Sequence, residues 1–146
     1  MKSIFLIILT IISLQGCAQN NHMLNNDTVV EYTASTRGYF YKTTVTKNTI
    51  TLTKDRSEIE IEKIDCKKEQ WDNIISLIND IEVEKIETFN PPTTKRQVDA
   101  AAHTNIAIKI NDAIYQSQTF DSGSPPVELE PLVKAILTLG KSVEKQ

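Results

Sequence analysis

The chain of 146 residues carries 16 lysines and arginines against 19 aspartates and glutamates, so its formal net charge is −3. A mildly acidic chain with interspersed lysines lacks the electrostatic footprint of a nucleic-acid-binding protein, and we expect no nucleic acid among its partners. Its four glycines are too few and too scattered for a glycine-rich phosphate-binding loop.

Residues 1–16 have the features of an export signal. Lys2 is followed by the apolar run SIFLIILTIISL, which has the length of a signal-peptide core and is shorter than the roughly 20 residues of a membrane-spanning helix. The run ends in LQGC, which resembles the lipobox of bacterial lipoproteins, whose cysteine receives lipid before the signal is cleaved. The resemblance implies that the mature chain begins at Cys17 and is held at the lipid bilayer by acyl chains on that residue. An ordinary signal peptide and an uncleaved anchor are the alternatives.

Residues 17–28 indicate how the domain is attached. They are polar and Asn-rich, as suits a flexible spacer between the membrane and a single globular domain over 29–146. By resemblance to Gram-negative lipoproteins, the lack of an aspartate beside Cys17 favours the outer membrane. The lack of an early acidic cluster favours its periplasmic face, and surface display stays open. The tripeptide DTV around Thr28 resembles a short bacterial O-glycosylation acceptor, with a chance match as the alternative.

Residues 29–64 alternate between apolar and polar side chains and are rich in Thr, Ile and Val, a pattern that predicts four strands. A two-residue turn at 47–48 would place a ladder of threonines on a solvated face and Ile50 on the core face. A second turn at KDRS would bring Ile59 and Ile61 onto the same core face.

A helix follows these strands. Asp65 or Cys66 begins it, because CKKE has the spacing of a capping box in which Cys66 stands for the usual serine and Glu69 reaches back. Trp71 and the isoleucines after it recur at helical spacing and predict a buried stripe. Because lipid occupies Cys17, Cys66 has no intrachain disulfide partner, and we expect it to be an unreactive thiol at the cap.

A second hairpin and a last helix complete the domain. The strands HTNIAIKI and AIYQSQTF, joined by a turn at 111–112, predict a register that sets His103 opposite Phe120 on the face away from the isoleucines. After the loop DSGSPP, a helix that begins near Glu130 would end at Gly140, a natural stop at a helix C-terminus. The fold class is therefore α+β, with antiparallel strands in the order ββββ-α-ββ-α and the two main helices packed on one face.

The order of four segments resembles a group of small secreted bacterial lipoproteins without an assigned function. The segments are TRGYF, KKEQWDNIISLI, KRQVDAAAHTNIAI and QTFDSGSPPVELEPLVKAIL. The resemblance covers nearly the whole mature domain. It implies the fold and the location at the cell envelope, and it implies no activity.

Two groups of residues are candidates for a site. Aromatic side chains and an arginine on an otherwise polar face are typical of the centre of a binding surface. The predicted partner-binding residues are Arg37, Phe40, His103, Phe120 and Asp121. Arg96 and Asp99 are interpreted as an ion pair that holds the loop before His103 against the sheet edge. If the two hairpins lay in different layers, both phenylalanines would instead be buried.

Patterns for catalysis and for metal binding are weaker. Ser122 or Ser124 with His103 and Asp99 could supply a nucleophile, a base and an orienting acid, but DSGS lacks the Gly-x-Ser-x-Gly setting of a nucleophile elbow. His103, Asp99 and Asp121 could ligate a metal, but no motif with paired His or Cys ligands accompanies them. We therefore predict no enzyme activity, no metal site and no cofactor.

The resulting prediction is a membrane-anchored, periplasm-facing lipoprotein that acts as a non-enzymatic binding or accessory module of the cell envelope, with an envelope protein or glycan as its partner. An immunity or inhibitor lipoprotein is the first alternative, because the loss of Lys2 with the signal peptide makes the net charge −4, which could complement a basic cleft. A hydrolase that uses Asp99 and His103 is the second alternative.

Overall fold

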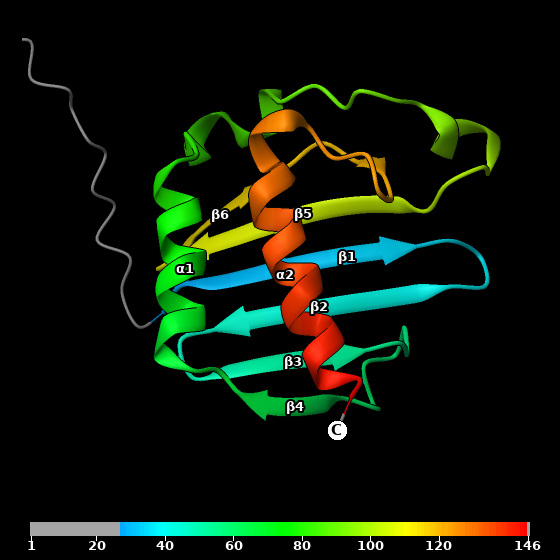
Figure 1. The fold of residues 1–146 in the computed structure, drawn as a ribbon. Coiled ribbons are helices and arrows are strands. Elements are labelled where there is room, and N and C mark those ends of the chain that lie inside the picture. Colours follow the sequence, from blue (N-terminus) through cyan, green and yellow to red (C-terminus); the bar gives the residue numbers. More distant parts are fainter. Residues whose placement is uncertain (1–26, 146) are drawn as a thin grey trace, which may run out of the picture.

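The computed structural model describes residues 27–145, in which two helices cross one face of an antiparallel sheet (Figure 1). The strands are β1 (Val29–Ser35), β2 (Phe40–Thr46), β3 (Thr49–Thr53), β4 (Glu62–Asp65), β5 (His103–Ile110), β6 (Ala113–Gln116) and β7 (Phe120–Asp121). The helices are α1 (Lys68–Asn79) and α2 (Glu130–Val143), with short 3-10 helices η1 (Val83–Thr88), η2 (Lys95–Val98) and η3 (Val127–Leu129). The strands lie in the order β4-β3-β2-β1-β5-β6, and β7 pairs with β5. The predicted α+β class and order of elements are confirmed, with β7 as an additional short strand.

The core lies between the helices and the sheet face that they cover. Every second residue of β1 and β2 is buried, as the alternation of side chains along a strand requires. α1 contributes Trp71, Ile74 and Ile78 at helical spacing. α2 contributes Leu132, Val133, Ile136, Leu139 and Val143. A fully buried Leu or Ile side chain adds about 1.5–3 kcal/mol, so this layer holds both helices on the sheet.

The β2–β3 hairpin has the predicted register. Val45 pairs with Ile50 on the core side, and Thr44 pairs with Thr51 on the opposite side. Between the strands lies the turn at 47–48. Alternation alone was enough to predict this hairpin, because a shift by one residue would have moved every apolar side chain into solvent.

The predicted corner between β3 and β4 is wrong. Ile59 and Ile61, which the alternation places in the core, are 82% and 52% exposed. The cause is a longer loop, since the Asp55 carboxylate accepts hydrogen bonds from the N–H of Ser57 at 2.9 Å and of Ile59 at 3.1 Å. β4 therefore starts later, and Ile64 takes the core-side position.

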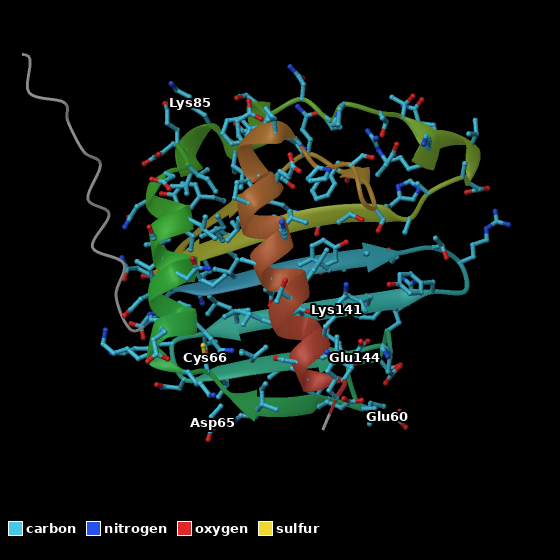
Figure 2. The ribbon with its side chains drawn as sticks, viewed as in Figure 1. Glu60, Asp65, Cys66, Lys85, Lys141 and Glu144 are labelled. Atoms are coloured by element: carbon cyan, nitrogen blue, oxygen red, sulfur yellow. The ribbon has the colours of Figure 1, made fainter. Side chains whose placement is uncertain are left out.

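α1 begins later than predicted, with Lys67 as its N-cap. The N–H of Lys67 donates to Oε1 of Gln70 at 2.9 Å, so these residues form the side-chain half of a capping box in place of Cys66 and Glu69. Cys66 directly follows β4, and its N–H donates to the carbonyl of Asn48 in the β2–β3 turn at 2.9 Å. It lies at the foot of α1 (Figure 2), where burial raises the pKa of its thiol.

A bulge after β6 changes the face on which this hairpin ends. Up to Ser117 the strands keep the predicted register: the Ser117 N–H donates to the Ile106 carbonyl at 2.9 Å, and Ser117 Oγ accepts the Ile106 N–H at 3.0 Å. One extra residue then shifts β7, so that Phe120 pairs with Thr104 and not with His103. The shift turns Phe120 from the solvated face into the core, where it is fully buried.

α2 continues past the glycine at which the sequence predicts its end. At Gly140, a Cβ atom would lie 2.6 Å from Thr43 Oγ1 and closer still to the Tyr41 hydroxyl. Gly140 is therefore a point where the helix approaches the sheet closely, and it is not a C-terminal stop.

The predicted signal peptide, the lipidation site Cys17 and most of the predicted spacer lie outside the described residues. Within 27–145, none of the helices combines the length and the apolar character that crossing a membrane requires. Thr28 is only 1% exposed, so its hydroxyl is not accessible for glycosylation in the folded domain.

Candidate ligand-binding site

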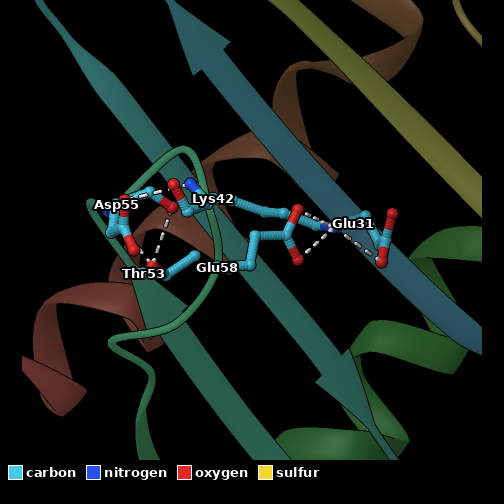
Figure 3. Close-up of polar contacts among 6 residues, drawn as sticks. Glu31, Lys42, Thr53, Asp55 and Glu58 are labelled. Atoms are coloured by element: carbon cyan, nitrogen blue, oxygen red, sulfur yellow. Dashed lines mark hydrogen bonds and ion pairs between the residues drawn. The ribbon is translucent and has the colours of Figure 1, made fainter.

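The sheet face opposite the helices, called here the open face, carries polar side chains. They include Glu31, Thr33, Lys42, Thr44, Thr46, Thr49 and Thr51. Near the middle of this face, Lys42 Nζ lies 3.4 Å from Glu31 and 3.1 Å from Glu58 (Figure 3). Burial lowers the pKa of Lys42, but the hydrogen bond to Glu58 and the charge of Glu31 outweigh that effect and raise it. Because Lys42 is paired with both carboxylates, an anionic ligand has little to bind at the middle of the open face.

A cavity of about 470 Å³ opens at one end of the open face, beside the end of β1. Its lining comes from the end of β1 and the turn after it, the β3–β4 loop, the end of η2 and the start of β5. The lining residues are Ser35, Thr36, Arg37, Arg56, Asp99 and His103. Ser35 pairs with Phe40 on one side and with His103 on the other, so strand register brings these segments together. The volume lies within the range of about 300–1,000 Å³ found for small-ligand sites.

Arg56 connects two of these segments. Its Nη2 donates to the carbonyl of Thr36 at 2.7 Å and to that of Tyr39 at 3.5 Å. Its guanidinium lies over the ring of Phe40, 5.4 Å from the ring centroid, within the range of a cation–π contact. The guanidinium is therefore oriented before any ligand arrives.

Three more ionisable side chains line the cavity, those of Arg37, Asp99 and His103, and all three residues are exposed. Arg37 sits in the β1–β2 turn, which is closed by the Thr36 N–H donating to the Tyr39 carbonyl at 2.9 Å. Within residues 27–145 the guanidinium of Arg37 forms no ion pair. Asp99 follows η2 in the left-handed region, with φ 55°. The cavity therefore holds two guanidiniums, an imidazole and one carboxylate.

The loop beside the cavity is held by Asp121. This carboxylate, 1% exposed, accepts hydrogen bonds from the Thr93 hydroxyl, from the N–H of Lys95 at 2.7 Å, and from the N–H of Arg96 at 2.9 Å and its Nη1 at 3.1 Å. Burial raises the pKa of Asp121, but these hydrogen bonds outweigh burial and hold the pKa well below its usual range. The ion pair of the loop is thus Arg96 with Asp121, whereas the predicted partner was Asp99.

The structure brings together part of the predicted partner-binding surface. Arg37 and His103 line the cavity, and Phe40 lies beneath Arg56. Phe120 and Asp121 do not belong to it, because the bulge buries the first and the loop at 93–96 covers the second. Both are structural residues.

Arg56 is the charged cavity residue that the sequence analysis missed; Ser35 and Thr36 were not predicted as site residues either. From the sequence, Arg56 is placed only in the tight corner KDRS and is given no role. Only the longer loop built on Asp55 lets it reach the carbonyl of Thr36. The sequence signal was the aspartate two residues before a serine, a spacing that favours a local side-chain turn.

The residues considered for catalysis and metal binding separate in space. Asp99 and His103 line the cavity, but Ser122 and Ser124 do not; the serine at the cavity is Ser35. Within the described part of the chain, no group of three or more His, Cys, Asp or Glu side chains is placed to hold a metal ion.

The chain matches no protein-family model, and no curated protein matches it significantly.

Proposed function

We propose that the protein is a non-enzymatic binding module of the cell envelope, attached to the outer membrane by lipid on Cys17 and facing the periplasm. The observation that carries this proposal is the cavity beside the end of β1, which is lined by the oriented Arg56 and by Arg37, whose guanidinium forms no ion pair within residues 27–145. A cavity with a few fixed polar groups is the usual form of a ligand-binding site.

An attachment through the N-terminus would leave the cavity accessible. The chain enters the sheet at Val29, and β1 runs from there across the sheet to Ser35 (Figure 1). Ser35 lines the cavity. At about 3.3 Å per residue, β1 separates the two points by roughly 20 Å. A ligand at the cavity would therefore meet the end of the domain that is far from the attachment point.

The anchor can be tested with the two cysteines of the chain. Cells that express the full chain are fed a clickable palmitate analogue, and labelling and membrane fractionation are compared for wild type, Cys17→Ser and Cys66→Ser. We expect wild type and Cys66→Ser to be labelled and membrane-bound, and Cys17→Ser to lose both properties. Labelled Cys17→Ser protein would contradict the proposed anchor.

Binding at the cavity can be tested separately with a photo-crosslinking amino acid in the full chain. We place it at position 38, an exposed glycine beside Arg37 with open space around it, so that every residue lining the cavity is kept. The matched control is position 109, which is exposed near the other end of β5. We expect a discrete adduct with an envelope component at position 38 and none at position 109. Equal patterns at the two positions would contradict a binding role for the cavity.

A hydrolase is the second candidate, because Ser35, His103 and Asp99 line the same cavity. We rank it below binding, since no hydrogen bond within residues 27–145 joins the Ser35 hydroxyl to the His103 ring, and nucleophilic catalysis needs that contact. A fluorophosphonate probe discriminates the two: labelling of wild type that Ser35→Ala and His103→Ala both abolish would favour the hydrolase.

A further inference from the structure

The charge at the cavity differs from that of the protein as a whole. The chain has a net charge of −3, yet the cavity is lined by Arg37, Arg56 and His103 with Asp99 as its one carboxylate. Guanidinium groups match the planar oxygen pair of a carboxylate, and the oxygens of a phosphate, with two parallel hydrogen bonds. The anionic part of a ligand is thus expected between Arg37 and Arg56.

The two arginines differ in how they are prepared for an anion. Arg56 uses Nη2 on the carbonyls of Thr36 and Tyr39, which leaves other N–H groups of its guanidinium available. Arg37 projects from the closed turn and has no ion-pair partner in the described part of the chain. Fixing one guanidinium in advance reduces the conformational entropy lost on binding, while the other can adjust to the ligand.

The remaining lining groups indicate what accompanies the anion. The Asp99 carboxylate would repel a bare anion but accepts hydrogen bonds from hydroxyl groups. The hydroxyls of Ser35 and Thr36 can donate or accept. No lining residue of this cavity is hydrophobic, and Arg56 covers the ring of Phe40, so the aromatic anchors typical of protein interfaces would find no pocket here.

We propose that the cavity binds an anionic saccharide, a sugar unit that carries a carboxylate or phosphate next to free hydroxyl groups. The anionic group lies between Arg37 and Arg56, and a sugar hydroxyl donates to Asp99. This assignment rests on the proposed function of the cavity as a binding site and adds the chemical class of the ligand.

Calorimetric titration of the full, detergent-solubilised protein tests the assignment with defined probes. These are an oligogalacturonate, its neutral methyl ester, a hexose phosphate, inorganic phosphate and an Asp/Glu-rich peptide. We expect the uronate or the sugar phosphate to bind at least about tenfold more tightly than the neutral ester, the peptide and inorganic phosphate, with affinity that falls as salt is added.

Variants distinguish the two parts of the ligand. Arg37→Gln should weaken binding about tenfold, whereas Lys109→Gln, which removes an exposed lysine near the other end of β5, should not. Asp99→Asn should weaken saccharide binding, because the amide oxygen is a poorer acceptor than a carboxylate. Tighter binding in Asp99→Asn would show that the ligand is a bare anion and would overturn the saccharide assignment. Because Arg56→Gln removes contacts within the fold, it is interpreted only if Trp71 fluorescence shows the native core.

The outcomes also separate this assignment from the proposed function. Preferential binding of the peptide or of the neutral ester would overturn the anionic saccharide and leave the cavity as a binding site. If none of the probes binds while position 38 still crosslinks to an envelope component, the saccharide class fails alone. If position 38 also gives no adduct, the proposed function fails with it.

Discussion

At the scale of single residues, Asp121 shows how one carboxylate can hold a loop. It accepts hydrogen bonds from the N–H groups of Lys95 and Arg96, from the Arg96 guanidinium and from the Thr93 hydroxyl. Charge-assisted hydrogen bonds of this kind are about twice as strong as neutral ones. Asp121 therefore fixes the segment that leads to Asp99 at the cavity.

We expect Asp121→Asn to release the loop at 93–96. The amide has no charge to hold Arg96. Its NH₂ group replaces one of the two carboxylate oxygens, so the N–H donors on that side lose their acceptor. Hydrogen exchange at the amides of Lys95 and Arg96 should become at least about tenfold faster. Asp99→Asn is the matched control and should leave this exchange unchanged. If exchange became faster in Asp99→Asn and not in Asp121→Asn, the result would favour the predicted ion pair of Arg96 with Asp99.

Because of Asp121, we expect the stability of the domain to depend on pH. Because the pKa of Asp121 is lowered in the folded state, the unfolded chain binds a proton more readily near its pKa of about 3.9. The contribution to stability is therefore fully present above that value and is lost as the pH falls toward the folded-state pKa. Urea unfolding followed by Trp71 fluorescence should show wild type losing more stability than Asp121→Asn between about pH 5 and pH 2. An equal loss of stability in the two proteins over this pH range would contradict a stabilising role for the Asp121 carboxylate.

Substitution of Gly140 tests how closely α2 packs on the sheet. Alanine favours a helix over glycine by about 1 kcal/mol, but its Cβ would clash with Tyr41 and Thr43, and overpacking of a core costs about 1–3 kcal/mol. We expect Gly140→Ala to lower the free energy of unfolding by up to about 2 kcal/mol. In the Tyr41→Phe background, which lacks the nearer clashing atom, the loss should be smaller. An equal loss in both backgrounds would exclude the Tyr41 contact as its cause.

At the scale of elements, the parts predicted correctly are those in which the pattern is local. The β2–β3 hairpin follows from side-chain alternation across a two-residue turn. The β3–β4 loop and the bulge after β6 do not, because each depends on one side chain, Asp55 or Ser117, that replaces a backbone partner. A single extra residue at the bulge was enough to bury Phe120.

For the candidate site, too, the sequence predicts the residues on strands better than the residues on loops. The sequence places both Arg37 and His103 near the polar faces of their own hairpins, but the pairing of Ser35 with His103 that brings them to one cavity is known only from the structure. Arg56 depends on the length of the β3–β4 loop, and the burial of Asp121 depends on a loop with no periodic pattern. The cavity thus combines residues positioned by strands with residues positioned by loops, and the sequence indicates mainly the former.

Ser117→Ala tests the bulge. The change removes the acceptor of the buried Ile106 N–H, and a buried unpaired donor costs about 1–3 kcal/mol. We expect the free energy of unfolding to fall by this amount and the Ile106 amide to exchange faster. Ser122→Ala, at an exposed serine in the next loop, should change stability by no more than about 0.5 kcal/mol. Similar effects of the two substitutions would argue against the bulge contact.

At the scale of the whole molecule, the two ends of the sheet have different environments if the proposed anchor is correct. The turn at 47–48 lies at the end of the sheet where β1 begins, since Val29 pairs with Thr46, and the cavity lies at the opposite end. The first end would face the membrane surface.

Fluorescence quenching on vesicles measures this orientation. The lipidated full chain, with Cys66→Ser, is labelled at Asn48→Cys or at Arg37→Cys and reconstituted into vesicles that carry a headgroup quencher. We expect stronger quenching at position 48 than at position 37, because roughly 20 Å of strand separates the two ends of the sheet. Equal quenching would mean that the domain lies on its side.

The place of β1 in the sheet has a mechanical consequence. All seven residues of β1 pair with β2 on one side and with β5 on the other. A ligand that holds Arg56 and His103 and is pulled away from the membrane would load β1 from the segment before Val29, along the axis of this strand. Because Arg56 and His103 belong to other segments of the chain, the force would reach β1 across its ladders in shear, so that many hydrogen bonds share it at once. A domain tethered and loaded in this way resists rupture better than one whose edge strand is peeled off bond by bond.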